Sequence, residues 1–473
     1  MAAARYSFAI PLIVGCSQFM HQFDGVVIAT ALPTMARSMN EDPLRLNLAI
    51  TSYLLALAVF VPISGWLADR FGAKRVYLTA IAVFTASSLM CGLSQSLAAL
   101  VVSRVVQGIG GAMMIPVGQT IVAKTAPRTD LVKAMSYVSI PAALAPLFGP
   151  SVGGFIVTYF DWPWIFFINL PIGVLGLAMV WSKIPDLPPE PRAPLDVLGS
   201  ILLSAAVIGL VFGFESMGRG LLPAEVVAAV IVGGAICGVL YVLHARRIDN
   251  AVVDLSLLRV PTFRFAIAGG ALFYVGTTAV VFLLSLMLQL GFGFSAFAAG
   301  ATTLAGAIGS FSSRFLIRPT LRLFGFRVSL LINGAVTGAY LVICGFFRPS
   351  TPFSLILVLL FIGGVARSNQ FTAIQSLAYA DMPRSRMSGA TSFAAMSQQL
   401  AQSFGVGLAA LVIHLGLVWH ADASPTAADI GPGFFALAVV SIASLFVFFR
   451  LPPQAGASLG PGNPRAARAP GAD

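Results

Sequence analysis

The most evident shortage in this sequence is of charge. Only 10% of its 473 residues are charged, whereas 58% are hydrophobic, and the mean hydropathy is +0.91. A single soluble core cannot hold so large an apolar share, because a water-exposed surface needs far more charged side chains. The composition therefore excludes a soluble globular protein and predicts an all-α polytopic membrane protein.

Cysteine is scarce as well. The four cysteines, Cys16, Cys91, Cys237 and Cys344, lie far apart inside apolar runs, and none belongs to a CxxC pair. Isolated cysteines in apolar runs are typically small buried packing residues. Neither a disulfide framework nor a metal site is indicated.

Motifs of catalysis and ATP use are missing. The sequence has no HExxH, no cluster of metal-ligand histidines and no P-loop of the form GxxxxGK[ST]. These absences argue against a membrane enzyme and against an ATP-driven pump. From hydropathy alone, a channel, a receptor or a secondary transporter all stay open.

Apolar runs long enough to cross a bilayer occur fourteen times. The first six lie near 8–32, 47–68, 76–95, 98–123, 134–158 and 164–182. Two more, near 195–214 and 223–244, follow the stretch KIPDLPPEPRAP, which predicts an extended linker. The last six lie near 264–290, 296–316, 328–347, 352–379, 389–416 and 432–450.

The basic residues predict the orientation of these spans. If both termini are cytoplasmic, cytoplasmic segments hold 22 of the 28 basic residues, outside loops hold four, and two, Arg104 and Arg367, lie within spans. An excess of this kind marks the cytoplasmic side. The net charge of +11 is then a topology signal, and we expect no nucleic-acid partner.

The stretch GWLADRFGAKR, residues 65–75, gathers charge between two spans. Gly65 permits close approach of a neighbouring helix, and Gly72 permits a tight reversal. Asp69 is placed to face a helix N-terminus or an arginine in one conformation only. The residues alone leave two interpretations, a conformational latch or a polar turn that merely obeys charge topology.

Several stretches resemble a known family. GWLADRFGAKR resembles the loop between helices 2 and 3 of the major facilitator superfamily, RVVQGIGGA (104–112) its helix 4 motif, and GPSVGG (149–154) its antiporter-associated helix 5 motif. FDGVVIATALP (23–33) and WPWIFFINLPIG (162–173) are similar to the narrower fourteen-helix drug/proton antiporters, called EmrB/QacA-like. LLSLMLQLGFGFSAFAAG and ADMPRSRMSGATSF are similar in character to later segments of that family.

The resemblance implies the major facilitator fold. Six-helix bundles would occupy 1–182 and 264–450, with a linker and two extra transmembrane helices over 183–263 and a disordered cytoplasmic tail over 451–473. LFGFR (323–327) echoes RFGAKR, and Arg367 loosely mirrors Arg104. The second copy has no acid at the place of Asp69, so the latch is carried over only to Gly65, Asp69, Arg70, Gly72 and Arg75.

Intramembrane charge marks the candidate proton site. A charge in a span costs at least about 2.5–3.5 kcal/mol on insertion scales, so it needs a partner or a function. The resemblance implicates Asp24 and Arg104 in proton coupling. The alternatives are a carboxylate permanently paired with a cation, and an arginine that snorkels to the interface.

Uncharged polar groups predict the substrate site. His21 shares a helical face with Ser17 and Asp24, and this face is a proton relay or a substrate wall. Polar side chains also join helices, so each candidate has that alternative role. The candidates for substrate binding are His21, Gln107, Arg367, Asn369, Gln370, Gln398 and Gln402, with Gln375 as a further cavity-lining residue. Glu215 is expected at the interface.

The helix 5 motif supports export. The resemblance assigns it to Gly149, Pro150, Gly153 and Gly154, and Pro146 and Pro150 should bend the helix. We therefore predict a proton-coupled multidrug efflux antiporter of the bacterial inner membrane. The alternative is an exporter or uptake transporter for one metabolite or lipid.

The expected partners are few. We expect a lipophilic or cationic small-molecule substrate, the proton gradient as energy source, no cofactor and a monomer. An adaptor protein is not favoured, because the outside loop near 417–431 is short.

Overall fold

The computed structural model describes residues 8–41, 43–189, 194–216, 223–248, 251–294, 296–420 and 426–456. Within these ranges every regular element is a helix. The remaining residues include 190–193 of the predicted linker, 421–425 of the short outside loop and 457–473 of the predicted tail, and these parts of the predictions lie outside the described residues. The side chain of Glu215 is also outside the description.

The first group of helices corresponds to the predicted N-terminal bundle. Its members are α1 (Ala9–Met39), α2 (Pro43–Phe60), α3 (Ser64–Phe71), α4 (Ala73–Gly92), α5 (Leu97–Thr125), the short η1 (Arg128–Asp130), α6 (Leu131–Tyr159), α7 (Trp164–Phe167) and α8 (Asn169–Lys183). The second predicted span is bent by 57° between α2 and α3. Gly72 then takes a positive φ of 87° and ends α3, so the predicted tight reversal is present.

The middle pair and the second group follow. They comprise α9 (Val197–Ser216), α10 (Ala224–Ala245), η2 (Leu255–Arg259), α11 (Pro261–Thr278), α12 (Val280–Leu286), η3 (Met287–Gly291), α13 (Ala296–Gly345), α14 (Phe353–Ala380), η4 (Arg384–Arg386), α15 (Met387–His420) and α16 (Ala427–Phe449). α13 joins two helices across Gly325, whose φ of 71° is non-helical. Gly325 belongs to the stretch LFGFR, where the sequence predicts a break.

These helices are long and apolar enough for a membrane. Ten of those in the described ranges could cross a bilayer by length and composition, or eleven if α2 and α3 form one span. The long helices α1 and α6 have 31 and 29 residues. The prediction of fourteen spans stays a prediction.

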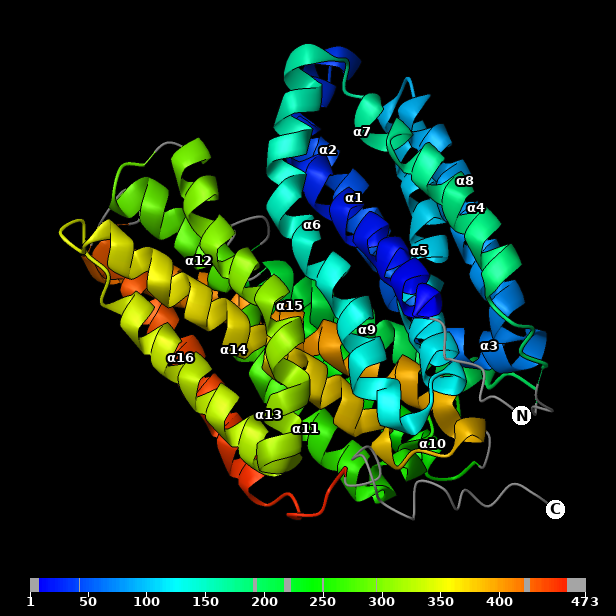
Figure 1. Cartoon of the computed structure of the whole chain (residues 1–473). Helices are drawn as coiled ribbons and strands as arrows, with labels where there is room; N and C mark the ends of the chain where they lie inside the picture. The colour runs from blue at the N-terminus through cyan, green and yellow to red at the C-terminus, as the bar shows by residue number, and fades with distance from the viewer. Residues whose placement is uncertain are drawn as a thin grey trace.

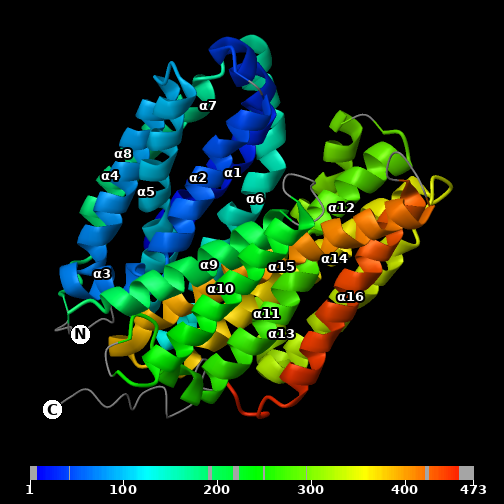
Figure 2. The same ribbon diagram turned by 180° about the vertical axis from the view of Figure 1, so that it is seen from behind.

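The two groups of helices meet at one end of the molecule and diverge toward the other (Figures 1 and 2). At the meeting end, Ser64 contacts Ser392 at 2.9 Å between hydroxyl oxygens, and Thr120 contacts Thr391 at 2.5 Å. α1 begins and α16 ends on this side of the molecule. We call it the closed end.

Gly65 permits close contact between the two groups of helices at the closed end. An ideal Cβ on Gly65 would lie 2.7 Å from the Ser388 carbonyl oxygen on α15, which is closer than real Cβ atoms come to such an atom. The close approach that the sequence predicts therefore occurs across the two groups, between α3 and α15. A residue larger than glycine would have to push the groups apart.

The extra helix α9 touches both groups. The Ser204 hydroxyl of α9 donates to the Val59 carbonyl of α2 at 3.3 Å. On its other side, an ideal Cβ on Gly407 of α15 would lie 2.4 Å from the Phe214 carbonyl oxygen. α9 thus lies along the seam between the groups, and α10 packs on α9 (Figure 2).

The first residues of the predicted tail differ in exposure. Leu451 is buried, and an ideal Cβ on Gly456 would lie 2.5 Å from the Phe326 ring. Leu451, Ala455 and Gly456 are therefore buried, whereas residues 452–454 are exposed. The predicted disordered tail over 451–473 stays a prediction.

Candidate functional site

A buried ion pair lies inside the first group of helices. Arg104 of α5 and Asp24 of α1 are 2.5 Å apart between Nη1 and Oδ2, and their side chains are 0% and 1% exposed. Arg104 therefore does not snorkel to the interface, and that alternative is excluded. The charged groups meet within the bundle, where a lone charge would be very costly.

Amide side chains complete the surroundings of the pair. Asp24 Oδ1 accepts hydrogen bonds from Gln107 Nε2 at 3.0 Å and from Asn169 Nδ2 at 3.1 Å. Gln107 also accepts from Arg104 at 2.6 Å and donates to the Ser88 hydroxyl at 2.8 Å. Four helices, α1, α4, α5 and α8, thus hold one carboxylate in place.

An aromatic ring and a histidine lie beside the arginine. Arg104 Nε donates to the Ala49 carbonyl at 3.1 Å, and the guanidinium lies 4.2 Å from the centroid of the Tyr53 ring. The His21 ring is 5.9 Å from that of Tyr53, and neither His21 nitrogen has a hydrogen-bond partner among the described residues. Gly111 leaves this space open, since an ideal Cβ there would be 3.0 Å from His21 Cδ2. A polar path thus continues from the ion pair along α1.

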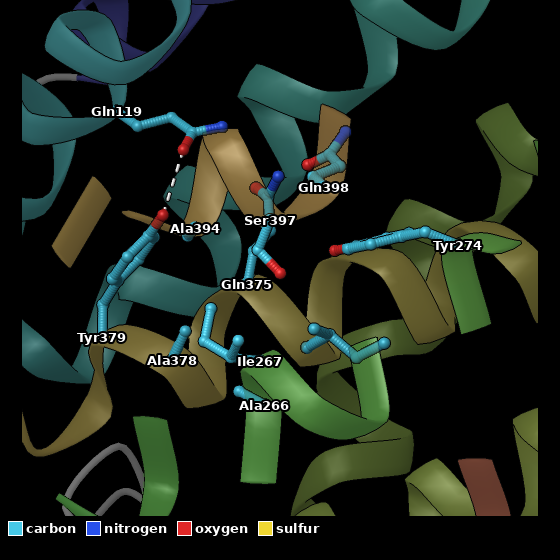
Figure 3. Close-up of a pocket in the computed structure, with 11 residues that line it drawn as sticks. Gln119, Ala266, Ile267, Tyr274, Gln375, Ala378, Tyr379, Ala394, Ser397 and Gln398 are labelled. Carbon is cyan, nitrogen blue, oxygen red and sulfur yellow. Dashed lines mark hydrogen bonds between the residues drawn. The ribbon is translucent and has the colours of Figure 1, made fainter. Parts of the chain in front are cut away.

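A small pocket lies between the two groups of helices near the closed end, with a cavity volume of about 20 Å³. α5, α11, α14 and α15 all contribute to it (Figure 3). Gln119 of α5 accepts a hydrogen bond from the Tyr379 hydroxyl of α14 at 3.0 Å, which closes one side. No charged side chain lines the pocket. Its surface combines amides and hydroxyls with alkyl groups, a combination that suits uncharged or weakly polar ligands.

Comparison with known proteins decides the family. Residues 14–406 match the Major Facilitator Superfamily. The chain belongs to this superfamily. It is a multi-pass membrane protein, in agreement with the predicted fold class.

Relatives and solved structures agree with this assignment. The chain is 35% identical over 444 residues to a Pectobacterium atrosepticum protein named "Putative multidrug resistance protein MdtD", covering 93% of this chain and 95% of the relative. An Escherichia coli O157:H7 protein of the same name is 35% identical over 445 residues, covering 93% and 94%.

The solved structures show the fold alone. The human organic anion transporter MFSD10 aligns with a TM-score of 0.67 at 15% identity, over 93% of this chain and 99% of that one. The proton:xylose symporter XylE, bound to 6-bromo-6-deoxy-D-glucose, aligns with a TM-score of 0.67 at 17% identity, over 95% and 97%.

Gln107 and the polar face of α1 make contacts that the sequence did not reveal. Gln107 is fully buried and donates to Asp24, and its role in substrate binding stays a prediction. Ser17, on the same face of α1 as His21, donates to the Ile13 carbonyl at 3.1 Å. Of the predicted polar stripe, only His21 therefore has unpartnered polar atoms next to the ion pair.

The residues of the predicted latch have different surroundings. Asp69 is buried and lies 3.4 Å from Lys124 Nζ of α5, inside the same group of helices. Arg70 and Arg75 are exposed. Charged contacts across the groups come instead from other residues: Arg128 donates to the Ala380 and Met382 carbonyls at the end of α14, and Arg318 of α13 lies 3.2 Å from Asp130 of η1.

The predicted residues of the second group have different surroundings. Gln398 lines the pocket between the groups, together with Gln375. Gln370 is fully buried, and neither of its amide atoms has a hydrogen-bond partner among the described residues. Asn369 is buried beside it on α14, and Gln402 is partly exposed on α15. Of the glutamines predicted to bind substrate, only Gln398 therefore lines this pocket.

The predicted helix 5 motif, residues 149–154, lies on α6 and packs α6 against α1. An ideal Cβ on Gly149 would lie 2.8 Å from Val26 Cγ1, whereas nothing lies within 4 Å of one on Gly154. Gly153 is buried, and the side chain of Pro150 is outside the description. α6 runs without interruption through the motif, so a close seam between helices is the motif's local role.

Sequence reasoning missed several residues of the site. Asn169 and Ser88 complete the Asp24 site, while Gln119, Tyr274 and Tyr379 line the pocket. Asn169 lies within the stretch WPWIFFINLPIG, so the family resemblance held a signal for it. The others are common residues in helices, and nothing in the sequence distinguishes them.

Proposed function

We propose that this facilitator is a proton-coupled efflux transporter of lipophilic compounds, working by alternating access between two six-helix bundles. The buried Asp24–Arg104 pair carries the proposal, since a carboxylate placed so deep must either bind protons or stay paired. Its relatives' names, which refer to multidrug resistance, support the substrate class. The superfamily supports transport rather than enzymatic activity.

Proton binding would change the balance of charge in the bundle. With Asp24 ionised, the pair is neutral overall. When a proton binds the carboxylate, Arg104 keeps its charge and loses its ionic partner inside the bilayer, which costs several kcal/mol unless the helices rearrange. The Ala49 carbonyl and the Tyr53 ring offer contacts that do not depend on the carboxylate. Protonation would therefore favour a different arrangement of α1 and α5.

Substrate would bind in the pocket between the bundles. Because Gln119 comes from one bundle and Tyr379 from the other, any relative rotation of the bundles opens or closes this pocket. Amide and hydroxyl groups among alkyl side chains suit lipophilic compounds, neutral or singly cationic. Exchange of a proton at Asp24 for substrate in the pocket then follows from one common motion.

The membrane setting belongs to the same proposal. We place the protein in a bacterial inner membrane with both termini cytoplasmic, so that the closed end faces the cytoplasm. The proton gradient is the energy source, and no cofactor or adaptor protein is needed. We also infer a monomer and membership of the fourteen-helix antiporters.

Ethidium accumulation in everted membrane vesicles tests the proposal. With an acidic vesicle interior, so that protons leave as dye enters, we expect wild-type vesicles to accumulate the dye and the Asp24→Asn variant to lose this activity. The matched control is Asp186→Asn, which changes an aspartate that is 93% exposed. Accumulation that is unaffected by collapse of the gradient would contradict proton coupling. A folded, inserted protein that moves no dye would favour the alternative of one specific metabolite or lipid.

A further inference from the structure

A second intramembrane arginine lies in the other bundle. Arg367 of α14 lines a cavity of about 60 Å³, which has room for a few water-sized groups. The other lining residues come from α12, α13 and α14, and they are Val280, Val281, Leu284, Thr303, Gly306, Ala307, Ser310, Tyr340, Leu360 and Gly364. One cation thus faces a mainly apolar cavity.

Arg367 has no ionic partner in the described part of the chain. No hydrogen bond or ion pair joins its guanidinium to another described residue, in contrast to Arg104, whose partner Asp24 lies at 2.5 Å. Arg314 of α13 is a second contrast. Its guanidinium lies 3.9 Å and 4.5 Å from the ring centroids of Phe311 and Phe315, whereas no such ring contact is found for Arg367.

The described residues of this bundle offer Arg367 no acidic partner along α14. From residue 255 to residue 420 the only acidic residue in the sequence is Asp381, which follows the last residue of α14. Asp381 is fourteen positions from Arg367, or about 21 Å at 1.5 Å per residue of helix. Asp429, at the start of α16, is engaged with Thr426 in a capping box, and Asp422 lies outside the described residues. Among the described residues, Arg367 is therefore available to an anion that is not part of the chain.

The depth of Arg367 favours a mobile ligand over a lipid headgroup. Arg367 is the fifteenth of the 28 residues of α14, close to the middle of a span. Headgroups lie beyond a hydrocarbon core about 30 Å thick, so they are roughly 15 Å from the midplane. An anion that reaches Arg367 has to bring its own apolar body into the bilayer.

We propose that the Arg367 pocket binds the acidic group of an amphiphilic organic anion, carried as a substrate. The guanidinium takes the sulfonate or carboxylate, and the alkyl side chains of Val281, Leu284 and Leu360 take the apolar body. The Thr303 and Ser310 hydroxyls lie on the same wall. The transport step rests on the proposed function, but the binding step does not.

Equilibrium dialysis with a matched pair of ligands tests the binding step. Naphthalene-2-sulfonate and its neutral sulfonamide share one apolar body and differ in charge. On protein in nanodiscs of zwitterionic lipid, we expect wild type to bind the sulfonate at least about tenfold more tightly than the sulfonamide, as charge-assisted hydrogen bonds allow. Arg367→Gln should remove this preference, and Arg367→Lys should keep part of it.

Two controls make the result decisive. Arg322→Gln removes an exposed charge of α13, just before the break at Gly325, and should leave the preference unchanged. Thermal unfolding of Arg367→Gln in the same nanodiscs reports folding, and its midpoint should stay close to that of wild type. Equal loss of both ligands in Arg367→Gln, or no preference for the sulfonate in wild type, overturns the proposal.

Lipid composition and transport separate the remaining outcomes. If adding phosphatidylglycerol to the nanodiscs abolishes sulfonate binding, a lipid headgroup occupies Arg367 and the substrate assignment falls. Gradient-driven sulfonate uptake by everted vesicles, lost in Arg367→Gln, supports the transport step. Sulfonate binding without any gradient-driven uptake of either dye or sulfonate refutes the proposed function and leaves the anion site standing.

Discussion

The two bundles place an arginine on corresponding helices and surround it in opposite ways. Arg104 of α5 is fully buried against a carboxylate, an amide and an aromatic ring, whereas Arg367 of α14 lines a cavity that contains no acid among the described residues. In the first bundle the charge is neutralised internally, as the proposed response to a proton requires. In the second bundle the proposed partner of the charge is a ligand. Two bundles of the same fold can thus hold two kinds of site, because a few neighbouring residues determine whether each arginine is paired within its bundle.

Removing the acid from the first bundle should have the largest effect. Asp24→Asn leaves Arg104 buried without an anion, so we expect gradient-driven ethidium transport to fall at least about 100-fold and stability to fall by about 3–5 kcal/mol. The double variant Asp24→Asn with Arg104→Gln removes both charges and should recover most of the stability, measured by thermal unfolding. Recovered transport in the double variant would contradict the role of the pair in coupling.

Adding an acid to the second bundle should make it resemble the first. Val281→Asp places a carboxylate in the wall of the Arg367 pocket, and we expect sulfonate binding to fall about tenfold or more because the arginine is then paired internally. Val281→Asn is the control for size and polarity and should bind the sulfonate within about threefold of wild type. Equal binding by the aspartate and asparagine variants would show that Arg367 does not determine affinity. Equilibrium dialysis measures all three proteins.

Pushing the bundles apart tests whether their different sites are joined by one motion. Gly65→Ala brings a methyl group against the Ser388 carbonyl, and overpacking of this kind costs about 1 kcal/mol or more in the closed arrangement. We expect the population closed at this end to fall about fivefold, measured by spin-label distances between α3 and α15. Gly154→Ala, where nothing lies within 4 Å of the new methyl, is the control. Unchanged distances in Gly65→Ala would indicate that the close contact is not maintained.

The smallest effect should come from a second difference between the bundles. The first bundle has Asp69 paired with Lys124, and the matching stretch LFGFR has no acid. Asp69→Asn makes the two alike, and we expect transport to fall about two- to fivefold with near-normal membrane insertion, since Lys124 keeps some contact with water. Wild-type transport at equal expression would leave GWLADRFGAKR with a topological role only.

Charge and hydropathy made part of the site predictable. Asp24 and Arg104 stand out in the sequence because a charged residue inside an apolar run is rare and costly. Their pairing could not be predicted, because 80 positions separate them and no local pattern relates one to the other. The sequence likewise does not reveal that Gln107 faces Asp24, because its position on α5 does not show which neighbouring helix it meets.

The sequence by itself determined the membrane class, the helical spans and the deeply placed charges, because hydropathy and the rarity of intramembrane charge act residue by residue along the chain. It also indicated the break at Gly325 and the reversal at Gly72, where only glycine takes a positive φ easily. The tertiary structure alone decided that Asp24 is enclosed with Arg104, that Gly65 touches the opposite bundle and that Arg367 has no ionic partner among the described residues. These properties depend on which helices lie side by side, and packing between distant segments sets that arrangement.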